Sequence, residues 1–334
     1  MNYNELRLKI KQGIDPLYVF FGEEVYLRTY MVSFLSEKIV EPDFADFNSL
    51  ILDSETLSAA TVADFFEAVP VMADKKLLLI KDAGLLSAKC RDAELLTKTF
   101  SDIPDYVTVI ITEDTADKRG KLYKSLSKAG TVCEFSYLER PELKQQVLKK
   151  LAAVKKNISN ADLDFFLDRC SSDLTEIRLN TEKLIAYTGS RDVIKKDDIE
   201  KNITPPLLNR VYDISEAVMN KNSDYALRLL SDLKKNGESG VRILAILGGY
   251  FSDLCRAAAI SKENMSYSDA VDAMNLPPSR RFVAQKLLSR AKSVDIKYAE
   301  KCLSDCVRAE NAIKNGTAAE WQALDMLVLE FLAK

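Results

Sequence analysis

Five short, almost continuous runs of apolar residues alternate with helix-like patterns over the first part of the chain. Such alternation is typical of a parallel sheet whose two faces are both covered by helices. The predicted strands are Leu17–Phe21, Ser49–Leu52, Leu77–Ile80, Val107–Ile111 and Val132–Phe135, and the predicted helices between them lie near Glu24–Lys38, Ser58–Glu67, Lys89–Phe100 and Asp117–Lys128. Residues 1–138 are therefore predicted to form an α/β domain.

The pattern changes after Tyr137, where strand signals almost disappear. Arg140-Pro141 indicates a helix start, because proline in a first turn lacks only an N–H group that the helix does not use. Helices are predicted over Leu163–Cys170 and Leu174–Tyr187. Thr204-Pro205-Pro206 then interrupts the helical pattern, and its two prolines stiffen the connection. We predict a small helical domain over residues 139–205.

Residues 206–334 are predicted to be helical throughout. One apolar face follows the spacing i, i+4, i+7, i+8, i+11 of an amphipathic helix. Its members are Ile243, Leu247, Tyr250, Phe251 and Leu254. We interpret such stripes as core packing. The predicted fold class is therefore α/β plus all-α, with one α/β domain followed by two helical domains.

The composition narrows the possible functions. The 334 residues carry a net charge of −3 with a pI near 5.5, so there is no overall basic signal for nucleic acid. Histidine is absent, which excludes Ser-His-Asp and Cys-His catalysis and lowers the expectation of an enzyme. Cys302 and Cys306 are too isolated for a four-ligand zinc site, and we expect no metal and no cofactor. With no secretory segment and no long apolar run, we expect a cytoplasmic protein with no membrane partner.

The stretch FFGEEVYLRT, residues 20–29, partly fits the phosphate-binding template G-x-x-x-x-G-K-[ST]. Gly22 and Thr29 match it. Leu27 stands where the second glycine would let a phosphate approach, and Arg28 replaces the lysine, for which it is a poor substitute. Two further carboxylates, at positions 23 and 24, would repel phosphate. We predict a degenerate loop that does not bind nucleotide.

A working ATPase also needs a later strand that ends in a magnesium-binding aspartate. The nearest match is the strand before Lys81-Asp82, where lysine occupies the aspartate position and Asp82 comes one residue late. A shift of one residue turns a side chain to the other face of a strand. An ordinary strand–turn–helix is therefore favoured over an ATP site, and we expect no catalytic residue.

Motifs in a fixed order over the whole chain carry a resemblance. They include LYVFFGEE at 17–24, VPVMADKKLLLI at 69–80, VYDI at 211–214 and AIKNG at 312–316. The chain resembles the delta subunit of the bacterial DNA polymerase III clamp loader. The resemblance implies an AAA+-like module of two domains joined to a helical collar, over residues 1–138, 139–205 and 206–334. It also implies a non-ATPase subunit of a pentameric loader whose other members hydrolyse ATP.

The resemblance further implies a contact with the sliding clamp (the beta subunit), one interface of which this subunit holds open for loading onto primer–template DNA. Matched position by position, the clamp contact falls on Val71 and Met72, with Pro70 expected to end the preceding helix. A valine is smaller than the aromatic residue common there, so affinity is expected to be lower. The alternative is that both side chains only cover the edge of the sheet. The collar is expected to bind the other loader subunits.

Lys121, Lys124 and Lys128 form a basic stripe at i, i+3 and i+7. Such a stripe is usually a solvated helix face. In a loader it is a candidate contact for another subunit or for DNA phosphates. Two other functions stay open at this point, an active AAA+ ATPase subunit of a loader or related remodeller, and a nucleic-acid adaptor that works without a clamp.

Overall fold

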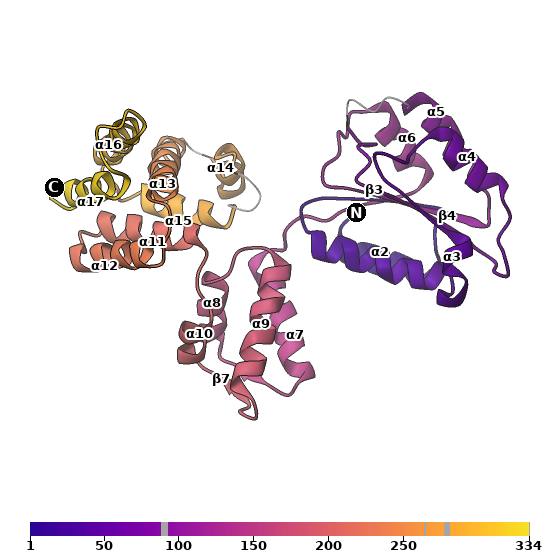
Figure 1. Ribbon diagram of the computed structural model, residues 1–334, viewed down its shortest axis with the longest axis horizontal. Coiled ribbons are helices and arrows are strands. Elements are labelled where there is room, and N and C mark those ends of the chain that lie inside the picture. The colour runs from indigo at the N-terminus through magenta and orange to yellow at the C-terminus, as the bar shows by residue number, and fades with distance from the viewer. Residues whose placement is uncertain (88–92, 264, 277–280, 334) are drawn as a thin grey trace. The chain divides into compact units, whose positions relative to one another are not determined.

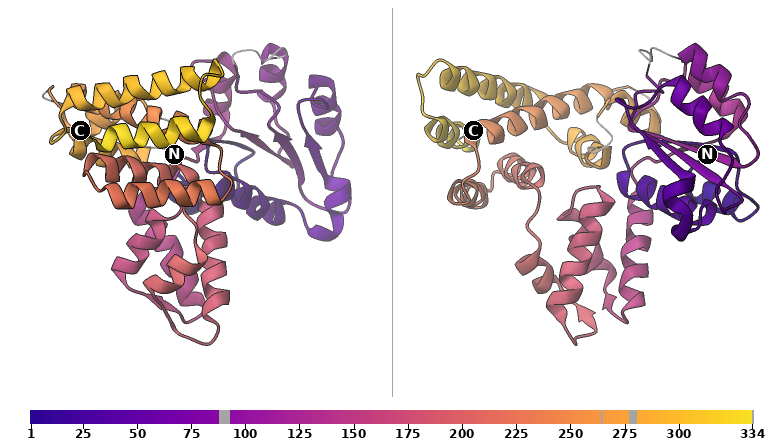
Figure 2. Two further views of the ribbon diagram at one scale, coloured as in Figure 1. Left: turned by 60° about the vertical axis from the view of Figure 1, so that its left-hand side comes forward. Right: turned by 45° about the vertical axis from the view of Figure 1, so that its right-hand side comes forward.

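The computed structural model describes residues 1–87, 93–263, 265–276 and 281–333 (Figure 1). Within these residues the chain forms two compact units, Met1–Leu138 and Glu139–Lys334. The first unit contains the sheet, and the second is almost entirely helical, as two further views show (Figure 2). The predicted fold class is confirmed. The further division of the second unit near residue 205 stays a prediction.

The first unit is built on a five-stranded sheet in the order β2-β3-β4-β1-β5, and every neighbouring pair is parallel. Strands β1 and β4 are buried along their whole length, which explains why their sequences are nearly continuous apolar runs. All five predicted strands form. Their bounds are β1 Leu17–Phe21, β2 Ser49–Leu52, β3 Lys76–Lys81, β4 Val107–Glu113 and β5 Thr131–Glu134.

Helices cover both faces of this sheet. From β1 the chain moves to β2 at one edge of the sheet, and it then returns through β3 and β4 to β5 at the other edge. Because each crossover is right-handed, the helix of the outward step and the helices of the return steps lie on opposite faces. Helix α2 lies on one face, and α4, α5 and α6 lie on the other (Figure 1). Of the predicted helix over 89–100, residues 89–92 lie outside the described part. The helices are α1 Tyr3–Ile10, α2 Val25–Ile39, η1 Pro42–Phe44, α3 Ala45–Asn48, α4 Ala59–Glu67, α5 Ala93–Thr99 and α6 Lys121–Ala129.

The second unit starts with four helices and one short strand pair. Helix α7 begins at Arg140 with Pro141 in its first turn, as predicted. Ser159 caps α8 by accepting the N–H of Asp162. The parallel pair β6–β7 was not predicted, because two residues per strand are too few to produce an apolar run. These elements are α7 Arg140–Ala153, β6 Asn157–Ile158, α8 Asn160–Asp168, α9 Leu174–Thr188, β7 Val193–Ile194 and α10 Lys196–Asn202.

The rest of the second unit is a helical bundle packed around α13. The five residues of its predicted apolar face are all buried. Among the described helices, α13 alone is long and apolar enough to cross a membrane, and half of that apolar stretch is buried in the bundle, as in a core helix. The bundle consists of α11 Leu207–Met219, α12 Ser223–Lys235, α13 Gly240–Ile260, α14 Tyr267–Ala273, α15 Arg281–Ala291, α16 Ile296–Lys314 and α17 Glu320–Leu332.

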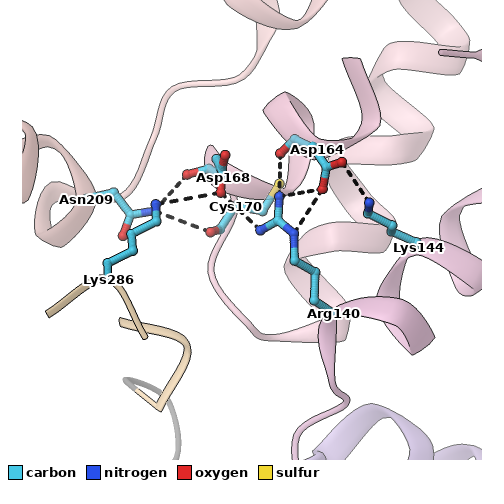
Figure 3. Close-up of polar contacts among 7 residues, drawn as sticks. All are labelled: Arg140, Lys144, Asp164, Asp168, Cys170, Asn209 and Lys286. Carbon is cyan, nitrogen blue, oxygen red and sulfur yellow. Dashed lines mark hydrogen bonds and ion pairs between the residues drawn. The ribbon is translucent and has the colours of Figure 1, made fainter. Parts of the chain in front are cut away.

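A polar cluster links the first helices of this unit to the bundle (Figure 3). Asp168, at the end of α8, pairs with Arg140 at 3.0 Å and with Lys286 of α15 at 3.8 Å. The backbone carbonyl of Asp168 accepts a hydrogen bond from Asn209 of α11 at 3.1 Å. The two cations offset the unfavourable position of a carboxylate at the negative end of a helix dipole. The cluster therefore connects α7, α8, α11 and α15.

Candidate functional site

An exposed apolar tip lies between α4 and β3. The side chains of Val71 and Met72 are 47% and 79% exposed, and Val69 beside them is exposed as well. Helix α4 ends at Glu67, and the backbone at the next residue is already extended. Pro70 therefore stands three residues beyond the helix and does not end it directly, although its ring prevents any continuation. The tip consists of residues 69–72.

The backbone of the tip is fixed by Asn48, a fully buried residue at the end of α3. Its amide nitrogen donates to the carbonyl of Val71 at 2.8 Å, and its amide oxygen accepts the N–H of Val71 at 2.8 Å. The same nitrogen donates to the carbonyl of Phe44 at 3.0 Å. The two bonds to Val71 act like a piece of β-ladder, so they fix the position of the tip against α3.

Met72 adopts a left-handed backbone conformation, with φ of 51°. Side chains other than glycine take this conformation at a cost of about 1 kcal/mol or more, and they do so where the surroundings determine the backbone. Because Asn48 holds the preceding residue, the strained Met72 projects its side chain into solvent.

The base of the tip is held by hydrogen bonds to the carbonyls at the end of α4. The buried ammonium of Lys76 donates to the carbonyls of Phe65 and Ala68 at 2.9 and 2.8 Å. The hydroxyl of Tyr106 donates to the carbonyl of Phe66 at 2.6 Å. These donors satisfy carbonyls that a helix end leaves unpaired. Burial lowers the pKa of Lys76. The arrangement can present an apolar anchor in one defined position.

Sequence analysis missed Asn48 and its exposed neighbour Phe47, whose side chain is 68% exposed. Neither residue stands near the tip in the sequence, since 23 positions separate Asn48 from Val71. The only available signal was a phenylalanine at the end of the predicted helix–strand connection, and its exposure depends on how α3 packs.

The glycine loop at residues 22–24 lies after β1, at the carboxyl edge of the sheet. Gly22 has φ of 124°, and a Cβ there would come within 2.2 Å of the carbonyl oxygen of Phe135. Glycine is therefore required by the segment that follows β5, which crosses directly over the loop. The need for a glycine at this position is explained without any phosphate.

The backbone N–H groups of the glycine loop are already used within the chain. The N–H of Gly22 donates to the carbonyl of Asp114 at 3.2 Å, and that of Glu24 donates to Phe135 at 2.9 Å. The N–H of Val25 donates to the carbonyl of Glu23 at 2.9 Å. Phosphate-binding loops depend on such groups being directed at the ligand. In this loop they are directed at the protein's own carbonyls.

Leu27 and Arg28 are both buried in the first turns of α2, while Thr29 is exposed. Arg28 donates to the backbone carbonyl of Glu113, and it forms an ion pair with the Asp114 carboxylate at 2.6 Å. The guanidinium thus ties α2 to the end of β4. Leu27 fills the core where the template requires a glycine.

Glu113 at the end of β4 is a further buried acid that the sequence did not indicate. One of its carboxylate oxygens accepts the N–H of Leu85 at 2.8 Å. Burial, together with the nearby charge of Asp82, raises the pKa of Glu113. Lys81, the last residue of β3, and Asp82 after it are both exposed, and Asp82 is in a left-handed conformation with φ of 46°. The carboxyl edge thus holds acidic groups close to the glycine loop.

Lys121, Lys124 and Lys128 lie together on the exposed face of α6, opposite the buried Leu122 and Leu126. None of the three lysines has an ion-pair partner among the described residues. The structure therefore joins the three lysines in one stripe. The tip precedes β3 and the glycine loop follows β1. Because the strands are parallel, the two loops lie at opposite ends of the strands.

Comparison with known proteins gives consistent matches over both units. The family model described as DNA polymerase III, delta subunit, matches residues 18–136, and the model of the C-terminal domain of that subunit matches residues 208–331. A curated DNA polymerase III subunit delta of Bacillus subtilis is 19% identical over 97% of this chain and 95% of its own length. A probable subunit delta of Aquifex aeolicus is 23% identical over 84% of this chain and 80% of its own.

Among solved structures, the DNA clamp loader delta protein of Bacillus subtilis matches with a TM-score of 0.70 and 19% identity. The match covers the whole of both chains. At this identity the structural likeness supports the fold, and the fold agrees with the family-model matches.

Proposed function

Because this chain belongs to the family of the DNA polymerase III delta subunit of the clamp loader, we propose that it binds the sliding clamp and helps to hold the ring open. The open ring is then loaded onto primer–template DNA during replication. The observation that supports this role is the tip at Val71 and Met72, which is apolar, exposed and fixed by Asn48. Interfaces are dominated by a few such anchors that enter a pocket on the partner.

The proposal includes no ATP hydrolysis by this chain. The N–H groups of the glycine loop bond to the protein, and Leu27 and Arg28 are packed inside it. These observations disfavour the alternative of an active AAA+ ATPase, which needs the same loop open to phosphate. Binding of ATP to the isolated chain would revive that alternative.

The partners proposed for this subunit follow from the same role. The helices of residues 206–334 are proposed to form a collar that binds the other loader subunits. The lysine stripe on α6 is proposed to contact DNA phosphates or a neighbouring subunit within the loaded complex. We place the protein in the cytoplasm, where replication takes place in bacteria.

The test is calorimetric titration of the chain into the sliding clamp of the same organism, without nucleotide. Met72→Asp is expected to lower the affinity by about 30-fold or more, since losing a good anchor costs about 2 kcal/mol or more. Leu179→Asp, at a similarly exposed leucine of α9, is the matched control and should bind normally. Binding unchanged in Met72→Asp would refute the site, and absence of binding by the unaltered chain would refute the role.

A further inference from the structure

The tip alone is small for a stable protein contact. An interface of standard size buries about 800 Å² on each partner, which corresponds to a circle with a radius of about 16 Å. The side chains of Val71 and Met72 supply only a small part of such an area. A partner that is seated on the tip must therefore also cover the surface around it.

Phe47 in α3 lies within that radius of the tip. It directly precedes Asn48, whose side-chain amide forms the two hydrogen bonds of 2.8 Å to the backbone of Val71. Consecutive Cα atoms are about 3.8 Å apart, and an asparagine side chain with one hydrogen bond spans at most about 8 Å more. The Cα atoms of Phe47 and Val71 are therefore at most about 12 Å apart. A standard interface centred on the tip reaches Phe47.

The exposure of Phe47 differs from that of other phenylalanines in the same unit. Its side chain is 68% exposed, whereas Phe66 and Phe100 are 6% and 2% exposed. Single exposed apolar residues are common, but several that lie together mark a binding surface. We call the combination of Phe47 with the tip the anchor patch. Its exposed members are Phe47, Val69, Val71 and Met72.

Acidic side chains border the anchor patch. Over residues 37–47 and 64–75, the exposed charged side chains are seven acids and two lysines. Of the lysines, Lys38 lies over the ring of Phe34, and Lys75 donates to the backbone carbonyl of Asp105. Lys76 is buried under the end of α4. A complementary partner is therefore apolar at its centre and bordered by lysine or arginine. The seven acids are Glu37, Glu41, Asp43, Asp46, Asp64, Glu67 and Asp74.

We propose that Phe47 is a second anchor for the sliding clamp, which enters an apolar depression bordered by cations next to the depression that receives the tip. This inference rests on the proposed function, because it takes the clamp as the partner of the tip. It adds a residue from a distant part of the sequence to the contact, and it specifies the charge of the clamp surface.

The first test is calorimetric titration of Phe47→Ala in the full chain into the clamp. We expect about 10-fold weaker binding, because a central aromatic anchor is lost. Leu8→Ala is the matched control, since Leu8 is 63% exposed and α1 packs beside β5, at the edge of the sheet opposite β2. It should bind normally. Both variants should keep their unfolding midpoints, which shows that Asn48 stays in place. Unchanged affinity in Phe47→Ala would overturn the inference and leave the tip as the clamp contact.

The second test is photo-crosslinking with p-benzoylphenylalanine, which keeps the aromatic ring at position 47. With the clamp bound, we expect a crosslink from position 47 to the clamp, in a segment with lysine or arginine beside apolar residues. The same group at position 8 should not crosslink to the clamp. A crosslink from position 47 to the chain itself, or none, while the clamp is bound would overturn the inference. Failure of the unaltered chain to bind the clamp would refute the proposed function, and this inference with it.

The third test reverses one charge at the border of the anchor patch. Asp43→Lys is expected to weaken clamp binding by about 5-fold, chiefly through slower association, because a cation then faces the cations of the clamp. Asp232→Lys, at an exposed acid of α12, changes the net charge by the same amount and should bind normally. Surface plasmon resonance measures both rates. Equal affinities for the two variants, or tighter binding by Asp43→Lys, would contradict a basic border on the clamp.

Discussion

The glycine loop and the tip lie at opposite ends of the parallel strands of one sheet. The two loops differ in whether they turn their groups towards the protein or towards solvent. The glycine loop directs the N–H groups of Gly22 and Glu24 at the carbonyls of Asp114 and Phe135. The tip directs its apolar side chains into solvent, and Asn48 satisfies its backbone from inside. The two loops thus differ in where their groups point: the glycine loop turns its backbone groups inward, and the tip, which we propose as the clamp contact, turns its side chains outward.

The largest expected effect comes from Gly22→Ala, which tests whether the glycine loop is closed. The new Cβ would clash with the carbonyl oxygen of Phe135 in a conformation that alanine avoids. We expect the free energy of unfolding to fall by about 3 kcal/mol or more, measured by urea denaturation. Gly249→Ala, in α13 with open space around it, is the control and should be neutral or stabilising. An unchanged free energy of unfolding in Gly22→Ala would show that the segment after β5 does not pack tightly over the glycine loop.

Asn48→Ala tests whether the tip is held from inside. The substitution removes all three hydrogen bonds of the Asn48 side chain and takes from the part-buried backbone groups of Val71 the partners that Asn48 provides. We expect a loss of about 2–3 kcal/mol in the free energy of unfolding, together with weaker clamp binding. Urea denaturation and calorimetry measure the two effects. Normal clamp binding by a destabilised variant would show that Asn48 supports the fold but not the tip.

Arg28→Lys restores the template residue of a phosphate loop and so tests whether the residue type alone closed the site. Lysine cannot reproduce both the bond to the Glu113 carbonyl and the pair with Asp114. We expect about 1–2 kcal/mol of lost stability and no ATP binding, measured with a fluorescent nucleotide. Gain of ATP affinity would mean that the loop opens when the guanidinium is removed.

Met72→Gly should move stability and binding in opposite directions. Glycine relieves the left-handed strain at φ of 51°, so the free energy of unfolding is expected to rise by up to about 1 kcal/mol. Clamp affinity is expected to fall, because the anchor is removed. Urea denaturation measures the change in the free energy of unfolding, and calorimetric titration of the same preparation measures the change in clamp affinity. A variant that is less stable would show that the Met72 side chain packs on the protein.

The sheet of the first unit could be predicted because each strand is a run of apolar residues between polar turns. Strand β3 extends one residue beyond the prediction at each end, where Lys76 and Lys81 hide the pattern. Helix α1 was missed because its apolar face is short, with only Leu6 and Ile10 buried. The chain order of the strands was visible in the sequence, but their order in the sheet required the structure.

The site was predictable only in part. Val71 and Met72 stand together in the sequence, and the resemblance singled them out, but no local pattern indicates that they are exposed and fixed. That property depends on Asn48, and the closing of the glycine loop depends on Phe135, more than one hundred residues from Gly22. Contacts between distant segments determine both, so only the assembled fold reveals them.

The position of Asn48 beside the edge strand has a consequence for local unfolding. Among the described residues, strand β2 pairs with β3 alone, and edge strands open more easily than central ones. Each opening that displaces Asn48 would also release Val71, so under the proposed function each opening lowers the fraction of molecules able to bind the clamp. A bound clamp should therefore slow hydrogen exchange in β2, far more than in the central strands. The rate of hydrogen exchange in β2 would then indicate whether the clamp is bound.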